Sequence, residues 1–346
     1  MPRRTLASLT TLRLGGPTGD TLTISDPSHW PDLVHTINRR GHETPLTLGH
    51  GSNVIASDAG HPGTVAVINT RGITAERVDD TTVAVTVNAG HPLTDLTAWA
   101  VTEHLAGIEC LAGIPGTAGA APVQNAGAYG QQISDTLHHL HAWDWHAGRM
   151  RTIPAQECQL GHRHSRFKQE PGRWTILSTT LHLTRTDTAA PITSRHLARE
   201  LGIPVGTRPP LAETTAAVLA NRHHRGLLLH PDSPDARQIG SAFLDPPVTP
   251  EQAARWSAAG CPVHTDRDGH WRVSAGWLLE LIGCHPGYRI TEGIHCSRRR
   301  TLALTARGET TATTFAQVLA DLAAQVDANT GINLRPEPVR VGHWPT

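Results

Sequence analysis

The most informative stretch of the chain, LAGIPGTAGAAPVQNAGAYG, runs from Leu111 to Gly130. Five glycines, two prolines and six alanines surround a single polar pair, Gln124 and Asn125. Glycine permits positive φ and close backbone approach, and successive N–H groups form concavities that hold anions. A long cofactor that carries a pyrophosphate suits such a surface. The alternative is an alanine- and glycine-rich surface loop, and the segment alone does not separate the two interpretations.

Length and charge narrow the class of protein. At 346 residues the chain exceeds the size at which one hydrophobic core stops growing, so we expect two or three domains. Its 30 basic and 30 acidic residues cancel, which argues against a general nucleic-acid-binding surface. No apolar run approaches the ~20 residues that cross a bilayer, and residues 1–5 lack the apolar core of a signal peptide. We therefore expect a cytoplasmic protein that binds neither nucleic acid nor membrane.

The cysteine and histidine patterns do not predict a metal site. The five cysteines are scattered without a C-x-x-C pair, which suggests neither a zinc knuckle nor a disulfide framework. Histidine is frequent, at 23 residues, and pairs such as His138-His139 invite a metal interpretation, but no H-E-x-x-H or similar spacing is present. Dispersed surface histidines are the simpler interpretation, and we predict no metal.

The order of apolar patterns predicts an α+β chain of three modest domains, at residues 1–70, 71–225 and 226–346. Alternating or continuous apolar runs predict strands, and apolar spacings of three and four residues predict helices. The expected strands cover residues 22–25, 45–48, 65–68, 82–88, 137–145, 174–183 and 301–305. The expected helices cover residues 28–40, 94–104, 211–220, 250–259, 274–282 and 313–330.

Five separated motifs contain the polar residues that chemistry would require. One is the Leu111–Gly130 stretch, and another is the turn GHGSN at Gly49–Asn53, which follows an expected strand as phosphate-binding turns often do. The remaining motifs are GHRHSRFK from Gly161, GSAFLDP from Gly240 and LRPEPVRVG from Leu334.

Each candidate residue in these motifs also has a simpler interpretation. A serine in a turn, such as Ser241, usually caps local backbone. Glu337, between two prolines, could be an ordinary exposed carboxylate. Arg163 lies among other basic residues and could belong to a solvated basic face. No single residue decides between these interpretations, so the order of the motifs along the chain matters.

In that order and spacing, the motifs resemble those of the UDP-N-acetylenolpyruvoylglucosamine reductase family, flavoenzymes of peptidoglycan synthesis. The family's G-x-G-S-N turn is matched at residues 49–53, and its flavin loop, I-P-G-x-x-G-x-x-P-x-Q-N-x-G-A-Y-G, from Ile114 to Gly130. Its motifs G-Y-R-D-S-x-F-K, G-S-F-F-x-N-P and L-x-P-E-x-x-x-x-G are matched in part at residues 161–168, 240–246 and 334–342. The resemblance extends from Thr10 to Gly342.

This resemblance implies an FAD-binding region in two subdomains, of the vanillyl-alcohol-oxidase type, followed by a C-terminal α+β domain that covers the substrate. It implies bound FAD, NADPH as co-substrate and a UDP-sugar enolpyruvyl ether as substrate, and we expect a monomer. The FAD pyrophosphate would lie against backbone N–H groups of residues 49–53 and 114–119. The expected cofactor-binding residues are Gly49, His50, Gly51, Ser52, Asn53, Gly113, Ile114, Pro115, Gly116, Thr117, Gly119, Ala120, Pro122, Gln124, Asn125, Gly127, Ala128, Tyr129 and Gly130.

The resemblance also implies roles for five polar residues. In the family's reaction a hydride reaches the terminal vinyl carbon, and negative charge develops on the adjacent carbon and the carboxylate. Arg163 would stabilise that charge, because its planar donors match a carboxylate. Ser241 would deliver the proton to carbon, with Glu337 as the second proton-handling or polarising group. Arg225, in the place of a lysine that holds the nucleotide diphosphate, and Asp245 would bind the substrate.

Several residues depart from the family pattern. His162 and His164 stand where the family has Tyr and Asp, and Ala242 and Asp245 stand where it has Phe and Asn. Three functions follow: the housekeeping reductase, a paralogue that performs the same reduction on another enolpyruvyl or nucleotide-linked substrate, and a flavin- or nucleotide-binding protein without turnover. The three intact catalytic residue types argue against the third function.

Overall fold

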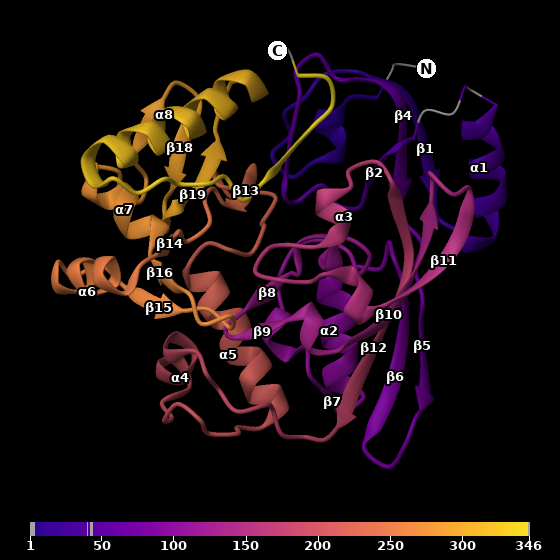
Figure 1. Ribbon diagram of the computed structural model, residues 1–346, viewed down its shortest axis with the longest axis horizontal. Coiled ribbons are helices and arrows are strands. Elements are labelled where there is room, and N and C mark those ends of the chain that lie inside the picture. The colour runs from indigo at the N-terminus through magenta and orange to yellow at the C-terminus, as the bar shows by residue number, and fades with distance from the viewer. Residues whose placement is uncertain (1–3, 40, 42–43, 345–346) are drawn as a thin grey trace. The chain divides into compact units, whose positions relative to one another are not determined.

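The computed structural model describes residues 4–39, 41 and 44–344, shown in Figure 1. By their contacts, the residues form two compact units. We call residues 1–18, 51–62 and 229–346 the C-terminal unit, and residues 19–50 and 63–228 the central unit. This division groups residues by contact, so the expected domain boundaries at residues 70 and 225 stay a prediction. Within the described residues, no helix has the length and apolar character needed to span a membrane.

An antiparallel sheet of six strands forms the framework of the central unit, in the order β11-β10-β12-β6-β5 with β7 paired to β12. The strands are β5 (Ile73–Arg77), β6 (Thr82–Asn88), β7 (Leu105–Ala106), β10 (Leu137–Asp144), β11 (Arg149–Pro154) and β12 (Trp174–Arg185). The predicted strands at 82–88, 137–145 and 174–183 are confirmed. The sequence does not predict β5 and β11, because their side chains are mostly exposed and lack an apolar alternation.

A register shift interrupts β10 where it pairs with β12. It falls between Leu137 and His139, so an extra residue is inserted at this point of the strand. Leu137 and Leu140 are buried, whereas His138 is exposed and His139 is half-exposed. The bulge therefore turns two consecutive imidazoles toward the solvent side of the sheet.

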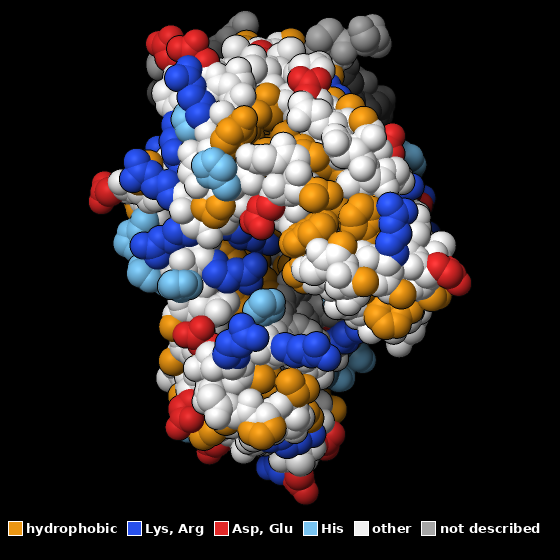
Figure 2. Space-filling model, turned by 90° about the vertical axis from the view of Figure 1, so that its left-hand side faces the viewer, with side chains coloured by type: hydrophobic (Ala, Val, Ile, Leu, Met, Phe, Trp, Pro, Cys, Tyr) orange, Lys and Arg blue, Asp and Glu red, His pale blue; other side chains and the backbone are white. Residues whose placement is uncertain are grey.

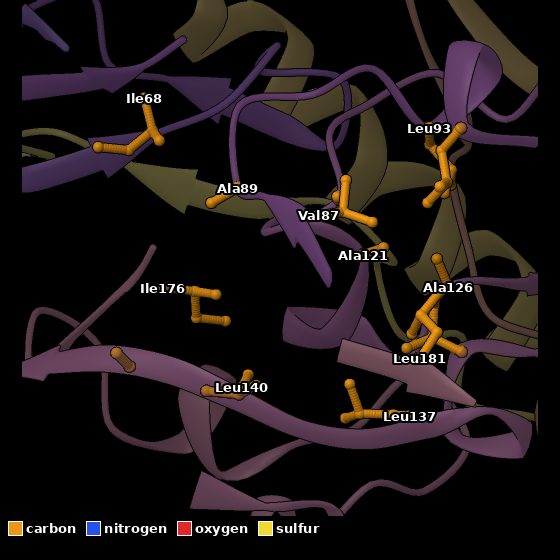
Figure 3. Close-up of a cluster of buried hydrophobic side chains, with 14 of the residues drawn as sticks. Ile68, Val87, Ala89, Leu93, Ala121, Ala126, Leu137, Leu140, Ile176 and Leu181 are labelled. Carbon is orange, nitrogen blue, oxygen red and sulfur yellow. The ribbon is translucent and has the colours of Figure 1, made fainter. Parts of the chain in front are cut away.

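The core of the central unit explains why the Leu111–Gly130 segment is rich in alanine. Figure 3 shows strand residues such as Val87 and Leu140 in one cluster with Ala121 and Ala126 of that segment. Ala118, Ala121 and Ala126 are each at most 6% exposed. Their small side chains let the segment lie close to the sheet, and burying them adds to the apolar area removed from water.

The rest of the central unit consists of short elements around this sheet. A three-stranded sheet, in the order β1-β4-β2, combines β1 (Thr18–Ile24), β4 (His61–Ile68) and β2 (Leu46–Leu48). A small hairpin pairs β8 (Gly127–Ala128) with β9 (Gln131–Gln132). The α-helices are α1 (Trp30–Asn38), α2 (Leu93–Thr102), α3 (Arg166–Gln169), α4 (Arg195–Leu201) and α5 (Leu211–His224). The 3₁₀ turns are η2 (Pro27–His29), η3 (Glu109–Leu111), η4 (Ala121–Gln124), η5 (Ile133–Asp135) and η6 (Ala155–Cys158).

The C-terminal unit is built on a second antiparallel sheet, in the order β13-β19-β18-β17. Its strands are β13 (Gln238–Ser241), β19 (Arg300–Ala306), β18 (Ile294–Ser297) and β17 (Arg289–Thr291). A smaller sheet contains β14 (Pro247–Val248), β16 (Trp271–Val273) and β15 (Val263–Thr265), and β3 (Val54–Ala56) pairs in parallel with β20 (Val339–Val341). The helices are η1 (Leu6–Leu9), α6 (Pro250–Ala258), α7 (Ala275–Leu281) and α8 (Ala312–Thr330).

Helix α8 shows how the sequence pattern becomes structure in this unit. Phe315, Leu319, Leu322 and Val326 follow the three- and four-residue spacing of one helix face, and all four are buried. The helix begins after Thr311, whose side chain accepts a hydrogen bond from a first-turn N–H, and it ends at a glycine with φ of +71°. The predicted helix at 313–330 is confirmed.

On the face that Figure 2 shows, Lys, Arg and His side chains gather towards the middle and the left. Acidic side chains are scattered singly, and hydrophobic ones lie between them. Over the whole sequence, acidic and basic residues are equal in number.

Candidate functional site

The segment predicted to bind the cofactor is fixed by hydrogen bonds to the turn between β6 and α2. Leu93 N–H donates to Gly116 O at 3.1 Å, and Gly119 N–H donates to Ala89 O at 2.8 Å. A Cβ placed on Gly119 would lie only 2.4 Å from that of Ala89. Gly119 is therefore required by close packing within the protein, independently of any ligand.

These internal bonds narrow the set of N–H groups that could hold an anion. Within residues 114–119, the N–H groups of Ile114, Ala118 and Gly119 donate to protein carbonyls. Gly116 and Thr117 are buried, and no acceptor for their N–H groups is recorded among the described residues. Since buried N–H groups nearly always have a partner, these two consecutive donors suit a bound anion.

The glycine turn that follows β2 begins against this pair of donors. A Cβ on Gly49 would lie 2.6 Å from Thr117 Oγ1, so a side chain there would push the two loops apart. Two residues later, Gly51 has φ of +58°, and a Cβ on it would lie 2.3 Å from Leu9 O. Both conditions exclude other residues at Gly51 without local rearrangement. Its buried N–H likewise has no acceptor recorded in the described part of the chain.

Asn125 joins the flavin loop to the arginine motif within the central unit. It is fully buried and has a left-handed backbone, with φ of +46°. Its Nδ2 donates to Gly161 O at 3.0 Å and to Ser134 Oγ at 3.2 Å, and its Oδ1 accepts from Ser134 N–H at 2.9 Å. One amide side chain thus holds three segments of backbone together.

Arg163, predicted to stabilise charge on the substrate, lies beside the Leu111–Gly130 segment. Its backbone also has positive φ, +54°, in the turn where Gly161 and His164 exchange backbone hydrogen bonds. Its guanidinium donates to Asn125 O at 3.1 Å and to Gly127 O at 2.6 Å. These carbonyls fix the plane of the guanidinium, so Arg163 is held in place by the cofactor loop and is not part of a freely solvated basic face.

A functional candidate that the sequence analysis missed is Arg222, on α5. It is 8% exposed, and its Nε has no hydrogen-bond partner in the described structure. A Cβ on Gly113 would lie 3.2 Å from that Nε. Burial lowers the pKa of Arg222 to about 10, partly offset by Tyr129. A buried cation without a carboxylate partner is costly, which makes Arg222 a candidate for binding an anion.

Signals for Arg222 were present in the sequence but weak. Arg222 stands three residues before Arg225, so both lie on neighbouring positions of one helix face. Nothing in the sequence shows that Arg222 is buried. Next to it, Asn221 accepts from Tyr129 Oη at 2.9 Å and donates to Glu200 at 3.0 Å, which connects α5 to the end of the flavin loop.

In the C-terminal unit, the structure brings Ser241 and Glu337 together. Glu337 N–H donates to the carbonyl of Ala242 at 3.0 Å, and Leu244 N–H donates to Arg335 O at 3.0 Å. The two segments therefore run antiparallel, and both Ser241 and Glu337 are half-buried. Asn53 of the glycine turn joins them, because its Nδ2 donates to Glu337 O at 3.4 Å.

Asp245 and Ala242, two departures from the family pattern, have clear places in this unit. Ala242 is fully buried, beside the equally buried Phe243. Asp245 Oδ1 accepts from the N–H of Ala275 at 2.9 Å, at the start of α7. Its Oδ2 lies 3.9 Å from His264 Nε2. Asp245 thus has a local structural role, and its predicted contact with substrate stays a prediction.

The predicted site residues therefore assemble in two groups, one in each unit. Ser241, Glu337 and Asn53 form the group in the C-terminal unit. Arg163 and the loop from 113 to 130 form the group in the central unit. Arg225, in the same unit, is the C-cap residue of α5.

Comparison with known proteins identifies the family. A family model described as an FAD binding domain matches residues 22–153, and one described as the C-terminal domain of UDP-N-acetylenolpyruvoylglucosamine reductase matches residues 232–341. The UDP-N-acetylenolpyruvoylglucosamine reductase of Thermobifida fusca is 37% identical, covering 97% of this chain and 96% of its own. This chain belongs to the UDP-N-acetylenolpyruvoylglucosamine reductase family.

Other relatives agree with this assignment. The reductase of the same name from Streptomyces coelicolor is 38% identical and covers 97% of this chain and 89% of its own. The crystal structure of UDP-N-acetylenolpyruvylglucosamine reductase from Thermus caldophilus matches with a TM-score of 0.64 at 22% identity, over 99% and 98% of the two chains. That match bears on the fold alone. The predicted family and the predicted fold class, an FAD-binding region followed by the family's C-terminal domain, are both confirmed.

Replacing Asn125 tests whether its side chain links the flavin loop to the arginine motif. Asn125→Gly keeps the positive φ but leaves Ser134 N–H and Gly161 O without a buried partner, so we expect a loss of about 2–4 kcal/mol in the free energy of unfolding. Urea unfolding measures this loss. Gln159→Gly is the matched control, because Gln159 is exposed and also has a left-handed backbone, with φ of +50°. Equal changes in the two variants would contradict the role of the Asn125 amide.

Proposed function

We propose that this protein reduces the enolpyruvyl ether of UDP-N-acetylenolpyruvoylglucosamine to UDP-N-acetylmuramate, with FAD as bound cofactor and NADPH as reductant, in peptidoglycan precursor synthesis. The observation that carries the proposal is the backbone pairing that brings the segment of Ser241 next to the segment of Glu337, in a chain of this family. A serine hydroxyl and a carboxylate on neighbouring segments suit proton delivery to a carbon atom.

The residues present suit FAD. Its pyrophosphate needs donors rather than side chains, and the buried N–H groups of Gly116 and Thr117 are of that kind. When bound there, FAD would supply hydride transfer between NADPH and the vinyl carbon of the substrate.

The chain's own residues then complete the reduction. Addition of hydride to the terminal carbon leaves an electron pair on the adjacent carbon, shared with the carboxylate. In our proposal Arg163, its guanidinium plane fixed by Asn125 O and Gly127 O, holds that carboxylate and stabilises the added charge. Ser241 Oγ gives its proton to the adjacent carbon, and Glu337 polarises the reacting group. One hydride and one proton add across the double bond, and NADPH becomes NADP⁺.

We further propose that Arg222 acts with Arg225 on the diphosphate of the substrate or cofactor. The support is the unpartnered Nε of Arg222 and its burial at 8% exposure. A phosphate would compensate a cation that the protein leaves without a carboxylate partner. The sequence expectations of a monomer and of a cytoplasmic location belong to the same proposal.

A second function is a paralogue that carries out the same reduction on another enolpyruvyl or nucleotide-linked substrate. Asp245 favours it, because a carboxylate stands where the family has an amide. Its Oδ1 accepts a hydrogen bond from the first residue of α7, whereas its Oδ2 lies 3.9 Å from His264 Nε2.

Flavin reoxidation separates these functions. The purified protein should be yellow and release FAD on denaturation. NADPH should bleach the flavin absorbance, and UDP-N-acetylenolpyruvoylglucosamine should restore it. Bleaching without restoration would reject the housekeeping substrate and favour the paralogue, and a colourless protein that cannot be reconstituted with FAD would reject both.

The role of Ser241 can be tested in the same assay. Ser241→Ala should leave bleaching by NADPH unchanged and slow substrate-dependent restoration by roughly 10²–10⁴-fold, the usual contribution of a positioned acid. Ser257→Ala, on the exposed side of α6, is the control. Equal slowing of both half-reactions would contradict proton delivery by Ser241.

Arg222→Met tests the anion-binding role. The variant removes a buried charge without a carboxylate partner, so we expect the melting temperature of the FAD-free, substrate-free protein to be unchanged or raised. We expect UDP, added as a probe, to raise the melting temperature of the native protein but not of the variant. If UDP stabilises both proteins equally, Arg222 does not bind the diphosphate.

A further inference from the structure

Four histidines gather on the solvent side of the large sheet in the central unit. They are His138, His139 and His141 of β10 and His182 of β12. The sequence predicts dispersed surface histidines, and it does not place these four together because His182 is distant in the chain. The β10 bulge adds to the cluster by turning both His138 and His139 outward.

The imidazole rings are in direct contact. His138 Nδ1 lies 2.9 Å from His139 Nδ1. The His138 ring stacks on that of His182, with centroids 3.9 Å apart, and the rings of His139 and His141 are 5.3 Å apart. Two nitrogens that face each other at this distance share one proton, because otherwise their lone pairs would repel.

The surroundings of the cluster suit a cation. Residues that pair with His139 and His141 on the neighbouring strands are uncharged: Thr180 and Ser178 on β12, and Pro154 and Thr152 on β11. The carboxylate of Asp79 acts on His182.

We propose that His138, His139, His141 and His182 form a binding site for one divalent transition-metal ion, of the zinc, nickel and copper class that imidazole prefers. The ion replaces the proton shared by the two Nδ1 atoms. Ligand bonds of about 2.0–2.1 Å at a tetrahedral angle separate two nitrogens by roughly 3.3 Å, so the His138–His139 pair opens only slightly.

A third ligand requires rotation of a ring. No three ligand atoms of this cluster lie within 4.8 Å of one another, a condition that the described residues meet only at Asp266, Asp268 and His270. His138 is exposed and His141 and His182 are half-exposed, and exposed side chains change rotamer within nanoseconds. Rotation of half-exposed His141 or His182 toward the His138–His139 pair supplies the third ligand in our proposal.

The Asp266–His270 cluster does not compete as a metal site. Asp266 Oδ1 accepts from the N–H groups of Asp268 at 3.0 Å and of His270 at 2.9 Å. Its Oδ2 accepts from Arg272 Nε at 2.8 Å. The protein already uses this carboxylate to shape the turn between β15 and β16, so it is not available to an ion.

Zinc titration of the full chain, untagged and stripped with a chelator, tests the proposal. We expect one Zn²⁺ per chain by calorimetry, and Cu²⁺ as a probe should show coupling to more than one imidazole nitrogen by electron paramagnetic resonance. His138→Gln/His139→Gln should weaken zinc binding by at least about tenfold. His29→Gln/His35→Gln, a pair of exposed histidines at η2 and α1, should bind as the native protein does.

Circular dichroism confirms that each variant is folded. Equal zinc affinity in the native protein and in His138→Gln/His139→Gln would overturn the proposal. Loss of binding in His270→Gln, with binding retained in His138→Gln/His139→Gln, would overturn it as well, because it would locate the ion at the β15–β16 turn.

Discussion

The side chain of Asn125 is the constraint on which the group of predicted site residues in the central unit depends. A loop made of glycine and alanine has few side chains with which to hold its own shape. The Asn125 side chain compensates for this by hydrogen bonding to both Ser134 and Gly161. The backbone carbonyl of Asn125 accepts a hydrogen bond from the guanidinium of Arg163. The position of the loop and the orientation of Arg163 therefore depend on the same residue, through its side chain in the first case and its backbone in the second.

In the C-terminal unit, backbone hydrogen bonds position the predicted site residues. Ser241 and Glu337 are distant in the chain. The segments that contain them pair through backbone hydrogen bonds in an antiparallel arrangement, so no contact between the two side chains is needed to bring the segments together. Such pairing fixes the two segments through their backbones. It also tolerates changes of neighbouring side chains, which explains how Ala242 and Asp245 can depart from the family pattern while the pairing is kept.

Much of this arrangement could be predicted from the sequence. Long periodic elements such as α8 and β6 were predictable because their burial repeats with the geometry of a helix or a strand. Motif order predicted the family and the candidate residues. Strands such as β5 and β11 have mostly exposed side chains, so the sequence of these strands shows no apolar alternation from which they could be predicted. The burial of Arg222 and the gathering of His182 with the β10 histidines depend on tertiary contacts that a local pattern does not contain.

The parallel pairing of β3 with β20 joins an early segment of the chain to one of its last. During synthesis on the ribosome, residues 54–56 emerge long before residues 339–341 are made. The segment of β3 therefore cannot pair with β20 until synthesis is nearly complete. Val339 N–H, which bonds to Asn53 O, and Glu337, whose carbonyl receives the Asn53 side chain, arrive in the same late step. The backbone pairing between the segments of Ser241 and Glu337 is therefore formed only after the chain is almost finished, and a product truncated before residue 336 lacks it altogether.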